Sequence, residues 1–305
     1  MTVRVADFWL RTPVIAASGT FAYGIEFEDI VSLNAIGALV TKGLSREPMA
    51  GNEAPRIIET AAGMMNAIGL QNIGVRAFLE TRLPRLRAIP CCPVIANVFG
   101  YTVEDYLAVI AILNEAKGIA AYELNVSCPN VQHGGMVFGS DAAMLSDLVG
   151  QAKKAATRPL IVKLSPNVTS IAAMAVAAAD AGADALSLVN TFVSLAIDVK
   201  TRRPRIANIT GGLSGPAIKP IALRMVYEAA RAVQIPILGT GGITTAEDAV
   251  EFLLAGATAV QVGTASYADP RAVERIARSL EQWCARNEVK RVSDLTGGML
   301  TDRKN

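Results

Sequence analysis

The sequence predicts an α/β fold, a (β/α)8 TIM barrel with inserted loops over its C-terminal face. Three observations predict it. Short runs of apolar and β-branched residues recur eight times along the 305 residues. Helical patterns, with apolar residues every three or four positions, separate most of these runs. Eight such units suit a closed barrel better than an open doubly wound sheet, and we expect residues 1–305 to form a single domain.

The predicted strands are continuously apolar, as expected for a parallel sheet covered by helices. In chain order they are 13–19, 35–43, 93–100, 120–128, 159–166, 185–190, 235–243 and 259–265. The clearest helices between them are 103–116, 141–156 and 246–257. Thr102 and Thr245 stand immediately before two of these helices, where a threonine side chain can cap the first backbone N–H groups.

Two connections are longer than ordinary loops, 44–92 after the second strand and 191–218 after the sixth. Long connections in compact domains are usually functional. Both follow the C-terminal ends of strands, where a barrel builds its active site. We therefore expect both insertions to contribute to the site.

The composition argues against a nucleic-acid or membrane-bound protein. Net charge is only +2, and aromatic residues make up 5% of the chain. The most apolar long window, 171–189, is interrupted by Asp180, Gly182 and Asp184, so it predicts a helix and then a strand. The N-terminus has no run apolar enough for a signal peptide, and the four cysteines form no C-x-x-C pair. These features predict a reduced, cytoplasmic protein.

Polar residues and glycines gather where the predicted strands end. The set comprises Ser18, Lys42, Gly43, Asn97, Asn125, Lys163, Asn190, Thr191, Gly241, Gly242, Gly263 and Thr264. His133 is the only histidine, so a histidine metal centre is excluded, and we expect no metal. Catalytic carboxylate pairs are missing as well. Amides, hydroxyls and two lysines suit a planar, polar, anionic ligand that needs both donors and acceptors.

Glycine-rich turns, GTGGI and VGTA, follow the seventh and eighth strands. At these positions backbone N–H groups beside helix N-termini form the usual phosphate site of such barrels. The alternative is that the glycines only permit tight turns. The pattern is not the G-x-G-x-x-G dinucleotide fingerprint. Two such turns at the expected strands favour a phosphate group on the ligand.

Lys163 lies in a strand that is otherwise apolar. Because a lysine buried without a counter-charge is costly, we predict that it faces a bound anion or a ring that becomes anionic, such as a reduced flavin. The alternative is a strand-end lysine that extends to water, and Lys42 has the same two interpretations. Glu123 has the strand parity of Asn125 but lies one layer deeper, and we predict it to be a structural partner of Lys163.

Cys128 follows the fourth strand, on a loop that should cover the barrel mouth. It is a candidate reactive thiol, metal ligand or buried filler, whereas Cys91, Cys92 and Cys284 are interpreted as small buried hydrophobes. A cysteine base with an unshifted pKa of about 8.5 should work better as the pH rises. A protease-like pair of Cys128 with His133 is disfavoured.

Short motifs along nearly the whole chain, residues 3–300, resemble those of the dihydroorotate dehydrogenases. In order they are ASGTF, TKG, NAIGLQN, IANVFG, ELNVSCPNV, IVKLSPN, LVNT, ITGGLSGPAIKPIALRMV and GTGGI through VGTA. Known members of that family bind FMN at the barrel mouth and oxidise dihydroorotate to orotate in pyrimidine synthesis. The resemblance makes Cys128 the base that removes a proton from C5 of the substrate while a hydride leaves C6 for N5 of the flavin.

The resemblance also implies the ligand contacts. Orotate contacts correspond to Lys42, Asn66, Ile68, Gly69, Leu70, Asn125, Asn130, Asn190 and Thr191. Contacts with FMN, one per chain, correspond to Ser18, Lys42, Gly43, Asn97, Asn125, Lys163, Val189, Gly215, Gly241, Gly242, Gly263 and Thr264. Asparagines can match the donor–acceptor edge of a pyrimidine, Lys42 can hold the carboxylate, and Lys163 can stabilise charge near flavin N1.

The motifs IANVFG, NVSCPNVQHGG and NITGGLSGPAIKP most resemble the two-subunit, NAD-linked class 1B. In that class a second protein carries FAD and a 2Fe–2S cluster. This chain has neither a suitable cysteine set nor a Rossmann fingerprint, so we expect a partner iron–sulfur flavoprotein and a heterotetramer of two of each chain.

Three other readings stay open. The first is the class 1A homodimer, which reduces fumarate. The second is another flavin barrel, acting on a pyrimidine ring or a uracil-like base. The third is a non-redox phosphate-binding barrel such as an aldolase or isomerase, in which Lys163 is the only strand-interior candidate for a Schiff base.

Overall fold

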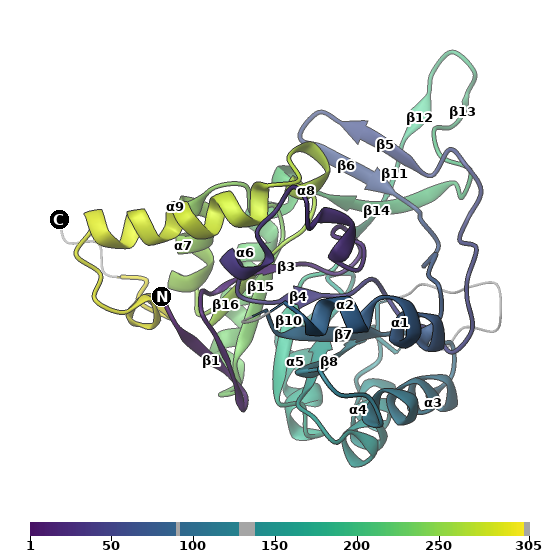
Figure 1. Cartoon of the computed structure of the whole chain (residues 1–305). Coiled ribbons are helices and arrows are strands. Elements are labelled where there is room, and N and C mark those ends of the chain that lie inside the picture. The colour runs from purple at the N-terminus through teal and green to yellow at the C-terminus, as the bar shows by residue number, and fades with distance from the viewer. Residues whose placement is uncertain (90–91, 128–137, 302–305) are drawn as a thin grey trace.

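Eight parallel strands close into a barrel in the computed structural model, which describes residues 1–89, 92–127 and 138–301. The predicted closed barrel is confirmed, and the order around it is β10-β15-β16-β3-β4-β7-β8-β9 (Figure 1). Each barrel strand falls inside one of the eight predicted runs but is shorter. They are β3 (Val14–Ala16), β4 (Leu39–Val40), β7 (Val94–Val98), β8 (Ala121–Asn125), β9 (Leu160–Lys163), β10 (Ala185–Leu188), β15 (Ile237–Thr240) and β16 (Ala259–Val262).

Helices surround the barrel and pack on one another in sequence, α3 on α4, α4 on α5, α5 on α6, α6 on α7 and α7 on α9. Their apolar faces and the continuously buried strands form one core cluster. The helices are α1 (Val75–Thr81), α2 (Leu83–Arg87), α3 (Val103–Asn114), α4 (Ala142–Ala155), α5 (Ile171–Asp180), α6 (Lys219–Ala232), α7 (Ala246–Leu254), α8 (Ala265–Ala268) and α9 (Ala272–Arg286). Short 3-10 turns occupy Ile25–Phe27, Leu33–Ala35, Pro216–Ile218 and Val292–Leu295.

Both predicted threonine caps are confirmed. Thr102 accepts a hydrogen bond from the backbone of Asp105 at 3.2 Å, and Thr245 accepts one from Asp248 at 3.1 Å. Each aspartate carboxylate in turn accepts a hydrogen bond from the backbone N–H of its threonine, which completes a capping box. Asp248 also pairs with Lys219 at 2.6 Å, so it joins the starts of α6 and α7.

Asp248 should make stability depend on pH. Burial raises the pKa of its carboxyl, but hydrogen bonds from Lys219, Thr244 and Thr245 outweigh burial and hold that pKa below its ordinary value of 3.8. A depressed carboxyl pKa stabilises the fold above the unfolded-state value, and this contribution is lost as the pH falls through the folded value. Asp248→Asn should therefore lower the free energy of unfolding at pH 7 by about 1–2 kcal/mol.

The difference between wild type and Asp248→Asn should shrink as the pH is lowered below about 4. Urea unfolding at several pH values measures it. The matched control is Glu80→Gln, which changes an exposed carboxylate on α1 and should stay within about 0.5 kcal/mol of wild type. A wild-type-to-variant gap that does not vary with pH would contradict the role given to the carboxylate.

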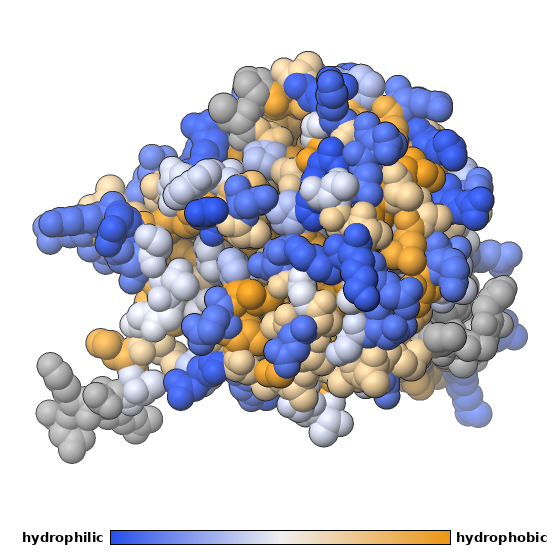
Figure 2. Space-filling view, turned by 90° about the horizontal axis from the view of Figure 1, so that it is seen from below, coloured by the Kyte–Doolittle hydropathy of each residue, from blue (hydrophilic) through white to orange (hydrophobic). Residues whose placement is uncertain are grey.

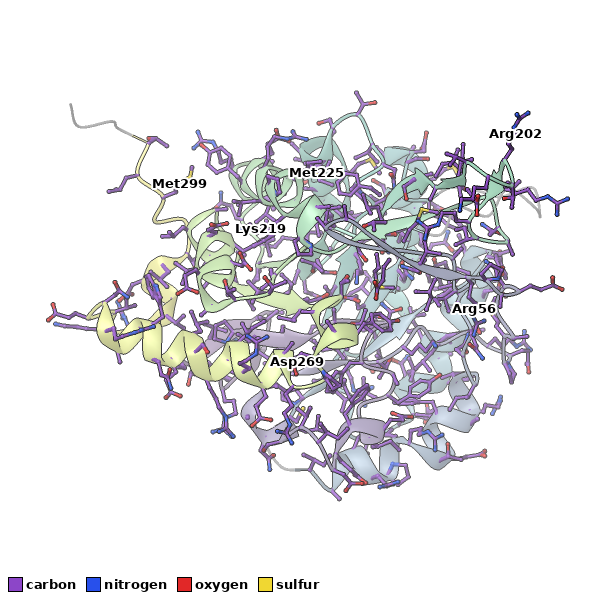
Figure 3. All side chains as sticks on the ribbon, turned by 90° about the horizontal axis from the view of Figure 1, so that it is seen from above. Arg56, Arg202, Lys219, Met225, Asp269 and Met299 are labelled. Carbon is purple, nitrogen blue, oxygen red and sulfur yellow. The ribbon has the colours of Figure 1, made fainter. Side chains whose placement is uncertain are left out.

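The two long insertions join into one antiparallel sheet, of order β11-β14-β6-β5. The first insertion supplies β5 (Ile57–Thr60) and β6 (Gly63–Asn66), and the second supplies β11 (Phe192–Leu195) and β14 (Thr210–Ser214). A hairpin of β12 (Ile197–Asp198) and β13 (Arg203–Pro204) extends outward from this sheet (Figure 1). Arg202, which lies in the turn between β12 and β13, points away from the molecule (Figure 3). This sheet was not predicted.

An N-terminal hairpin of β1 (Val3–Val5) and β2 (Phe8–Leu10) precedes the barrel and was not predicted either. It buries Val3, Val5 and Leu10. The surface seen in Figure 2 mixes hydrophilic and hydrophobic residues, with the hydrophobic ones in small patches. Within the described parts of the chain, no helix is both long enough and apolar enough to cross a bilayer.

Candidate active site

A layer of polar side chains crosses the barrel near the C-terminal ends of its strands. Barrel interiors are usually filled by branched apolar residues, so a polar layer here needs internal partners or a ligand. The side chains come from seven of the eight strand positions and are Thr41 after β4, Asn97 on β7, Glu123 on β8, Lys163 on β9, Ser187 on β10, Thr240 on β15 and Gln261 on β16.

Glu123 is the centre of this layer and is fully buried. Its Oε1 accepts a hydrogen bond from Asn97 Nδ2 at 2.7 Å and lies 3.9 Å from Lys163 Nζ. Its Oε2 accepts from Ser187 Oγ at 2.8 Å and from Gln261 Nε2 at 2.7 Å. A buried carboxylate is tolerated when it is paired and hydrogen-bonded in this way. The predicted partnership between Glu123 and Lys163 is confirmed.

Above this layer, two amides from the ends of β8 and β10, the strands on either side of β9, contact each other. Asn190 Nδ2 donates to Asn125 Oδ1 at 3.2 Å, and Asn190 Oδ1 accepts from the backbone N–H of Thr191 at 2.9 Å. The carbonyl oxygen of Asn125 accepts a 2.7 Å hydrogen bond from the hydroxyl of Tyr106 on α3. The structure thus brings three predicted substrate residues together and fixes the orientation of two side-chain amides.

Lys42 lies half-buried just after β4. Burial lowers the pKa of its ammonium group, the positive charge of Arg56 lowers it further, and Glu26 opposes both. A partly desolvated cation at a strand end is suited to bind a carboxylate. Burial removes part of the hydration of the ammonium group, and an ion pair with the carboxylate compensates for that loss.

The NAIGL run leaves the inserted sheet at Asn66, whose Nδ2 lies 3.5 Å from the carbonyl oxygen of Gly212. The chain then turns sharply, with left-handed backbone at Gly69 (φ 73°) and Leu70 (φ 56°). A Cβ on Gly69 would lie 2.6 Å from Asn52, so only glycine fits there. Ile68, also predicted to contact substrate, accepts a 3.0 Å hydrogen bond from the backbone N–H of Asn52.

The predicted phosphate-binding turns meet the second insertion. A Cβ on Gly242, after β15, would lie 2.7 Å from the carbonyl oxygen of Gly215, and both glycines have left-handed φ angles of 73° and 94°. Thr264, after β16, donates from its hydroxyl to Ser214 at 2.8 Å. The structure therefore gathers predicted flavin residues from the ends of two barrel strands and from the residue that follows β14.

The remaining predicted flavin residues lie at strand ends as well. The backbone N–H of Val189, which follows β10, donates to Thr240 at 2.9 Å, and the Leu188–Val189 peptide bond is cis. Gly241 has a φ of 140° and faces Ala222 of α6, while Ser18 after β3 is half-buried. Next to Gly263 there is room for a group the size of a Cβ.

The described residues fit a flavin ring. Asn97 Oδ1 is buried and has no hydrogen-bond partner within the protein. It is therefore an acceptor that an N–H group of a bound ligand would satisfy. A Cβ on Gly43 would come within 3.2 Å of that oxygen, so glycine keeps the space beside it open. Together with the Lys163 ammonium group, these atoms form a polar edge that matches a planar ring bearing both N–H and C=O groups.

The predicted base and one predicted substrate residue cannot be placed. Cys128 and Asn130 lie outside the described residues, as do His133 and Cys91. Burial raises the pKa of the Cys92 thiol to about 12 and raises that of Cys284 as well, so both thiols are protonated at neutral pH. That agrees with their interpretation as unreactive, apolar fillers.

Sequence reasoning missed three contributors to the polar layers: Ser187, Gln261 and Tyr106. A signal was present for two of them, because Ser187 in ALSLVN and Gln261 in AVQVGTA are single polar residues inside buried strands. Such residues are satisfied by one another when strands close into a barrel. Tyr106 gave no signal, since its helix position predicted only packing.

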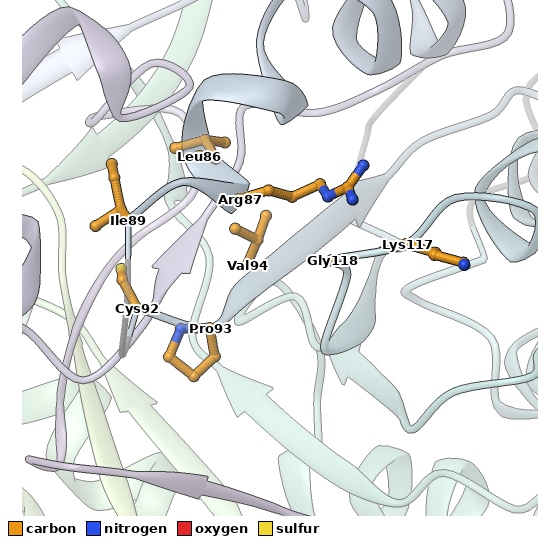
Figure 4. Close-up of a pocket in the computed structure, with 8 residues that line it drawn as sticks. All are labelled: Leu86, Arg87, Ile89, Cys92, Pro93, Val94, Lys117 and Gly118. Atoms are coloured by element: carbon orange, nitrogen blue, oxygen red, sulfur yellow. The ribbon is translucent and has the colours of Figure 1, made fainter.

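A separate cavity of about 430 Å³ lies near the start of β7, away from the strand ends that carry the site (Figure 4). Its lining includes Leu86, Arg87, Cys92, Val94 and Lys117, and none of the predicted site residues. The site described above is therefore defined by its hydrogen bonds and strand-end geometry, not by this cavity.

Comparisons with known proteins identify the relatives of this chain. The family model described as Dihydroorotate dehydrogenase matches residues 1–283. A protein of Solibacter usitatus named putative dihydroorotate dehydrogenase A (fumarate) is 61% identical over 97% of this chain and 97% of its own. Proteins of Citrifermentans bemidjiense and Geobacter sulfurreducens, each named dihydroorotate dehydrogenase B (NAD(+)), catalytic subunit, are 56% identical over 98% of both chains.

The fold also matches a solved structure, that of DHODH in complex with ferulenol from Eimeria tenella. The TM-score is 0.82, and the match covers 97% of this chain and 88% of that one. Sequence identity is 21%, so this likeness concerns the fold alone.

Proposed function

This chain belongs to the dihydroorotate dehydrogenase family, and from that premise we propose that it oxidises dihydroorotate to orotate in pyrimidine biosynthesis. The observation that carries the proposal is the convergence of Asn125, Asn190 and Thr191 on one end of the barrel, directly above the layer of Asn97 and Lys163. Paired amides, together with a partly desolvated lysine that follows another strand of the same barrel, suit a planar ring with a carboxylate.

Bound FMN would supply the two-electron acceptance that no side chain of this protein can provide. We assign the chain's own residues three tasks. Asn125 and Asn190 orient the substrate ring, Lys42 holds its carboxylate, and Cys128 accepts the proton from C5. The first two tasks rest on the positions of these side chains, and the task of Cys128 rests on the motif around it.

The flavin assignment has a direct test. Purified protein, reconstituted with FMN if necessary, should show a flavin absorption spectrum that bleaches anaerobically on addition of dihydroorotate. The matched control is a compound of the same ring without the carboxylate, dihydrouracil, which should bleach it far more slowly because Lys42 has no partner. A colourless preparation that binds no added FMN would contradict the proposal and favour a non-redox phosphate-binding barrel.

For the electron acceptor we propose NAD+, reached through a partner subunit that carries FAD and a 2Fe–2S cluster in an assembly of two of each chain. Support comes from the relatives named as B (NAD(+)) catalytic subunits. The described residues contain no group of cysteine, histidine and carboxylate side chains that would hold a metal ion. The few cysteines of the chain favour a cytoplasmic location.

A fumarate-reducing homodimer is the second candidate, because the 61% identical relative carries that name. Co-purification from the native host separates the two. An iron–sulfur flavoprotein bound to this chain, with dihydroorotate-dependent reduction of NAD+, supports the first. A chain that elutes without a partner and oxidises dihydroorotate with fumarate supports the second.

Lys42 provides a third prediction. Lys42→Ala should raise the KM for dihydroorotate by about 10- to 100-fold, because it removes a charge-assisted hydrogen bond to the carboxylate worth about 1.5–3 kcal/mol. In wild type, the KM should rise at alkaline pH, beginning below 10.5 because the pKa of Lys42 is lowered. Lys200→Ala, which changes an exposed lysine on the β12–β13 hairpin, is the control. An unchanged KM for Lys42→Ala would contradict the assignment.

A further inference from the structure

We infer that Glu123 is a positioning residue that forces Asn97 to present its carbonyl oxygen, and not its NH2 group, to the flavin ring. The inference deepens the proposed function and rests on it for the presence of FMN. It concerns which end of the Asn97 amide, the NH2 donor or the carbonyl acceptor, faces Glu123, and the contacts of Glu123 determine that orientation.

An asparagine amide can turn over and exchange its donor and acceptor ends, and crystallographic density rarely distinguishes them. Here the neighbour decides. A carboxylate oxygen can only accept, and Glu123 Oε1 lies 2.7 Å from the side chain of Asn97. The reversed amide would bring two acceptors together inside a buried layer. Asn97 therefore gives its NH2 group to Glu123, and Oδ1 faces the other way.

Glu123 itself has little freedom to move. Ser187 and Gln261 donate to its other oxygen, Oε2, from two further strands, and its side chain is completely buried. Asn97 is held at its backbone as well, because its N–H donates to Thr41 Oγ1 at 3.0 Å. The orientation of the Asn97 amide is thus built into the barrel before any ligand binds.

The consequence is a buried acceptor without a donor, Asn97 Oδ1. Leaving such an atom unsatisfied costs about 1–3 kcal/mol, so a ligand that brings a donor is favoured over one that brings a second acceptor. The oxidised flavin ring has one N–H group, at N3, flanked by two carbonyl groups. We therefore assign Asn97 Oδ1 as the acceptor for that N–H.

N3-methyl-FMN tests the assignment, because methylation removes the donor and leaves the phosphate unchanged. The readout is the ratio of the dissociation constants of N3-methyl-FMN and FMN for the apoprotein, measured by quenching of flavin fluorescence. Using a ratio cancels general damage to the site. We expect about tenfold or more for wild type and less than about twofold for Asn97→Ala, where the acceptor is gone. Equal ratios for the two proteins would overturn the inference.

Glu123→Gln tests the positioning role. Glutamine can donate or accept, so the Asn97 amide is free to turn over, and the ratio should fall to within about threefold of the Asn97→Ala value. The matched control is Ser187→Ala, which removes a donor from the opposite oxygen of the same carboxylate and should keep the wild-type ratio. A Glu123→Gln protein that discriminates as wild type does would overturn the inference.

Glu123→Gln leaves Lys163 buried without its counter-charge, so it risks failing to fold. The double variant Glu123→Gln/Lys163→Met removes both charges of the pair, and the same fall in the ratio is expected of it. Failure of the proposed function looks different, because wild-type apoprotein would then bind no FMN at all. Wild-type binding of FMN without discrimination against N3-methyl-FMN overturns the present inference alone.

Discussion

Replacing Cys128 with alanine is expected to lower kcat by about 10²- to 10⁴-fold, the usual contribution of a positioned general base. FMN should stay bound with an unchanged visible spectrum, because no flavin contact is assigned to this residue. The fall in kcat is expected because, without the thiol, the C5 proton has no acceptor while the hydride leaves C6. Anaerobic stopped-flow measurement of flavin bleaching by dihydroorotate reports this half-reaction without the electron acceptor.

Two further variants make this test specific. Cys128→Ser should retain more activity than Cys128→Ala and should gain it as the pH rises, because a hydroxyl is a weaker acid than a thiol. Cys284→Ala changes a buried thiol on α9, 5% exposed, and should bleach at the wild-type rate. Bleaching of Cys128→Ala at the wild-type rate would remove Cys128 from the role of base.

The second large effect is expected for Lys163→Met. Lys163 is 6% exposed, and its Nζ lies 3.9 Å from Glu123 Oε1. Removing one partner of a buried ion pair typically destabilises a protein by about 3–5 kcal/mol, since the other charge is left uncompensated. The dissociation constant of FMN should also rise by about 10- to 100-fold, because a charge-assisted hydrogen bond to the ring is lost.

Chemical denaturation and FMN titration separate these two effects. The double variant Lys163→Met/Glu123→Gln should recover stability, because no buried charge remains, yet it should still bind FMN weakly. The control Lys153→Met breaks a surface ion pair with Asp184 at 2.6 Å and should leave FMN affinity unchanged. Wild-type FMN affinity and wild-type bleaching rate in Lys163→Met would contradict its assignment to the flavin.

The barrel could be predicted from the sequence because its signals are local. Each strand is a short apolar run, and Thr102 and Thr245 mark helix starts through contacts three residues away. The inserted sheet could not be predicted in this way. β6 pairs with β14 across the two insertions, and nothing in either short segment specifies the other as its partner. Pairing of distant strands is set by the closed barrel that brings them together.

The residues of the site likewise fall into those that the local sequence predicts and those that depend on contacts between distant strands. Strand-end residues such as Asn125 and Asn190 were predictable, because parallel strands in a barrel all end at one face. The role of Ser187 and Gln261 as donors to Glu123 was not, because it requires the register between strands. A single polar residue in an apolar strand indicates that its side chain has a hydrogen-bond partner. Only the closed barrel shows which residue that partner is.

The sheet that joins the two insertions also has a consequence for synthesis of the chain on the ribosome. The bond from Asn66 to Gly212 spans 146 residues, so β6 leaves the ribosome long before β14 exists. Until then, one edge of the β5–β6 hairpin has no neighbour, and unpaired edges recruit strands from other molecules. Nascent chains that stall before Thr210 should therefore be the ones most dependent on chaperones.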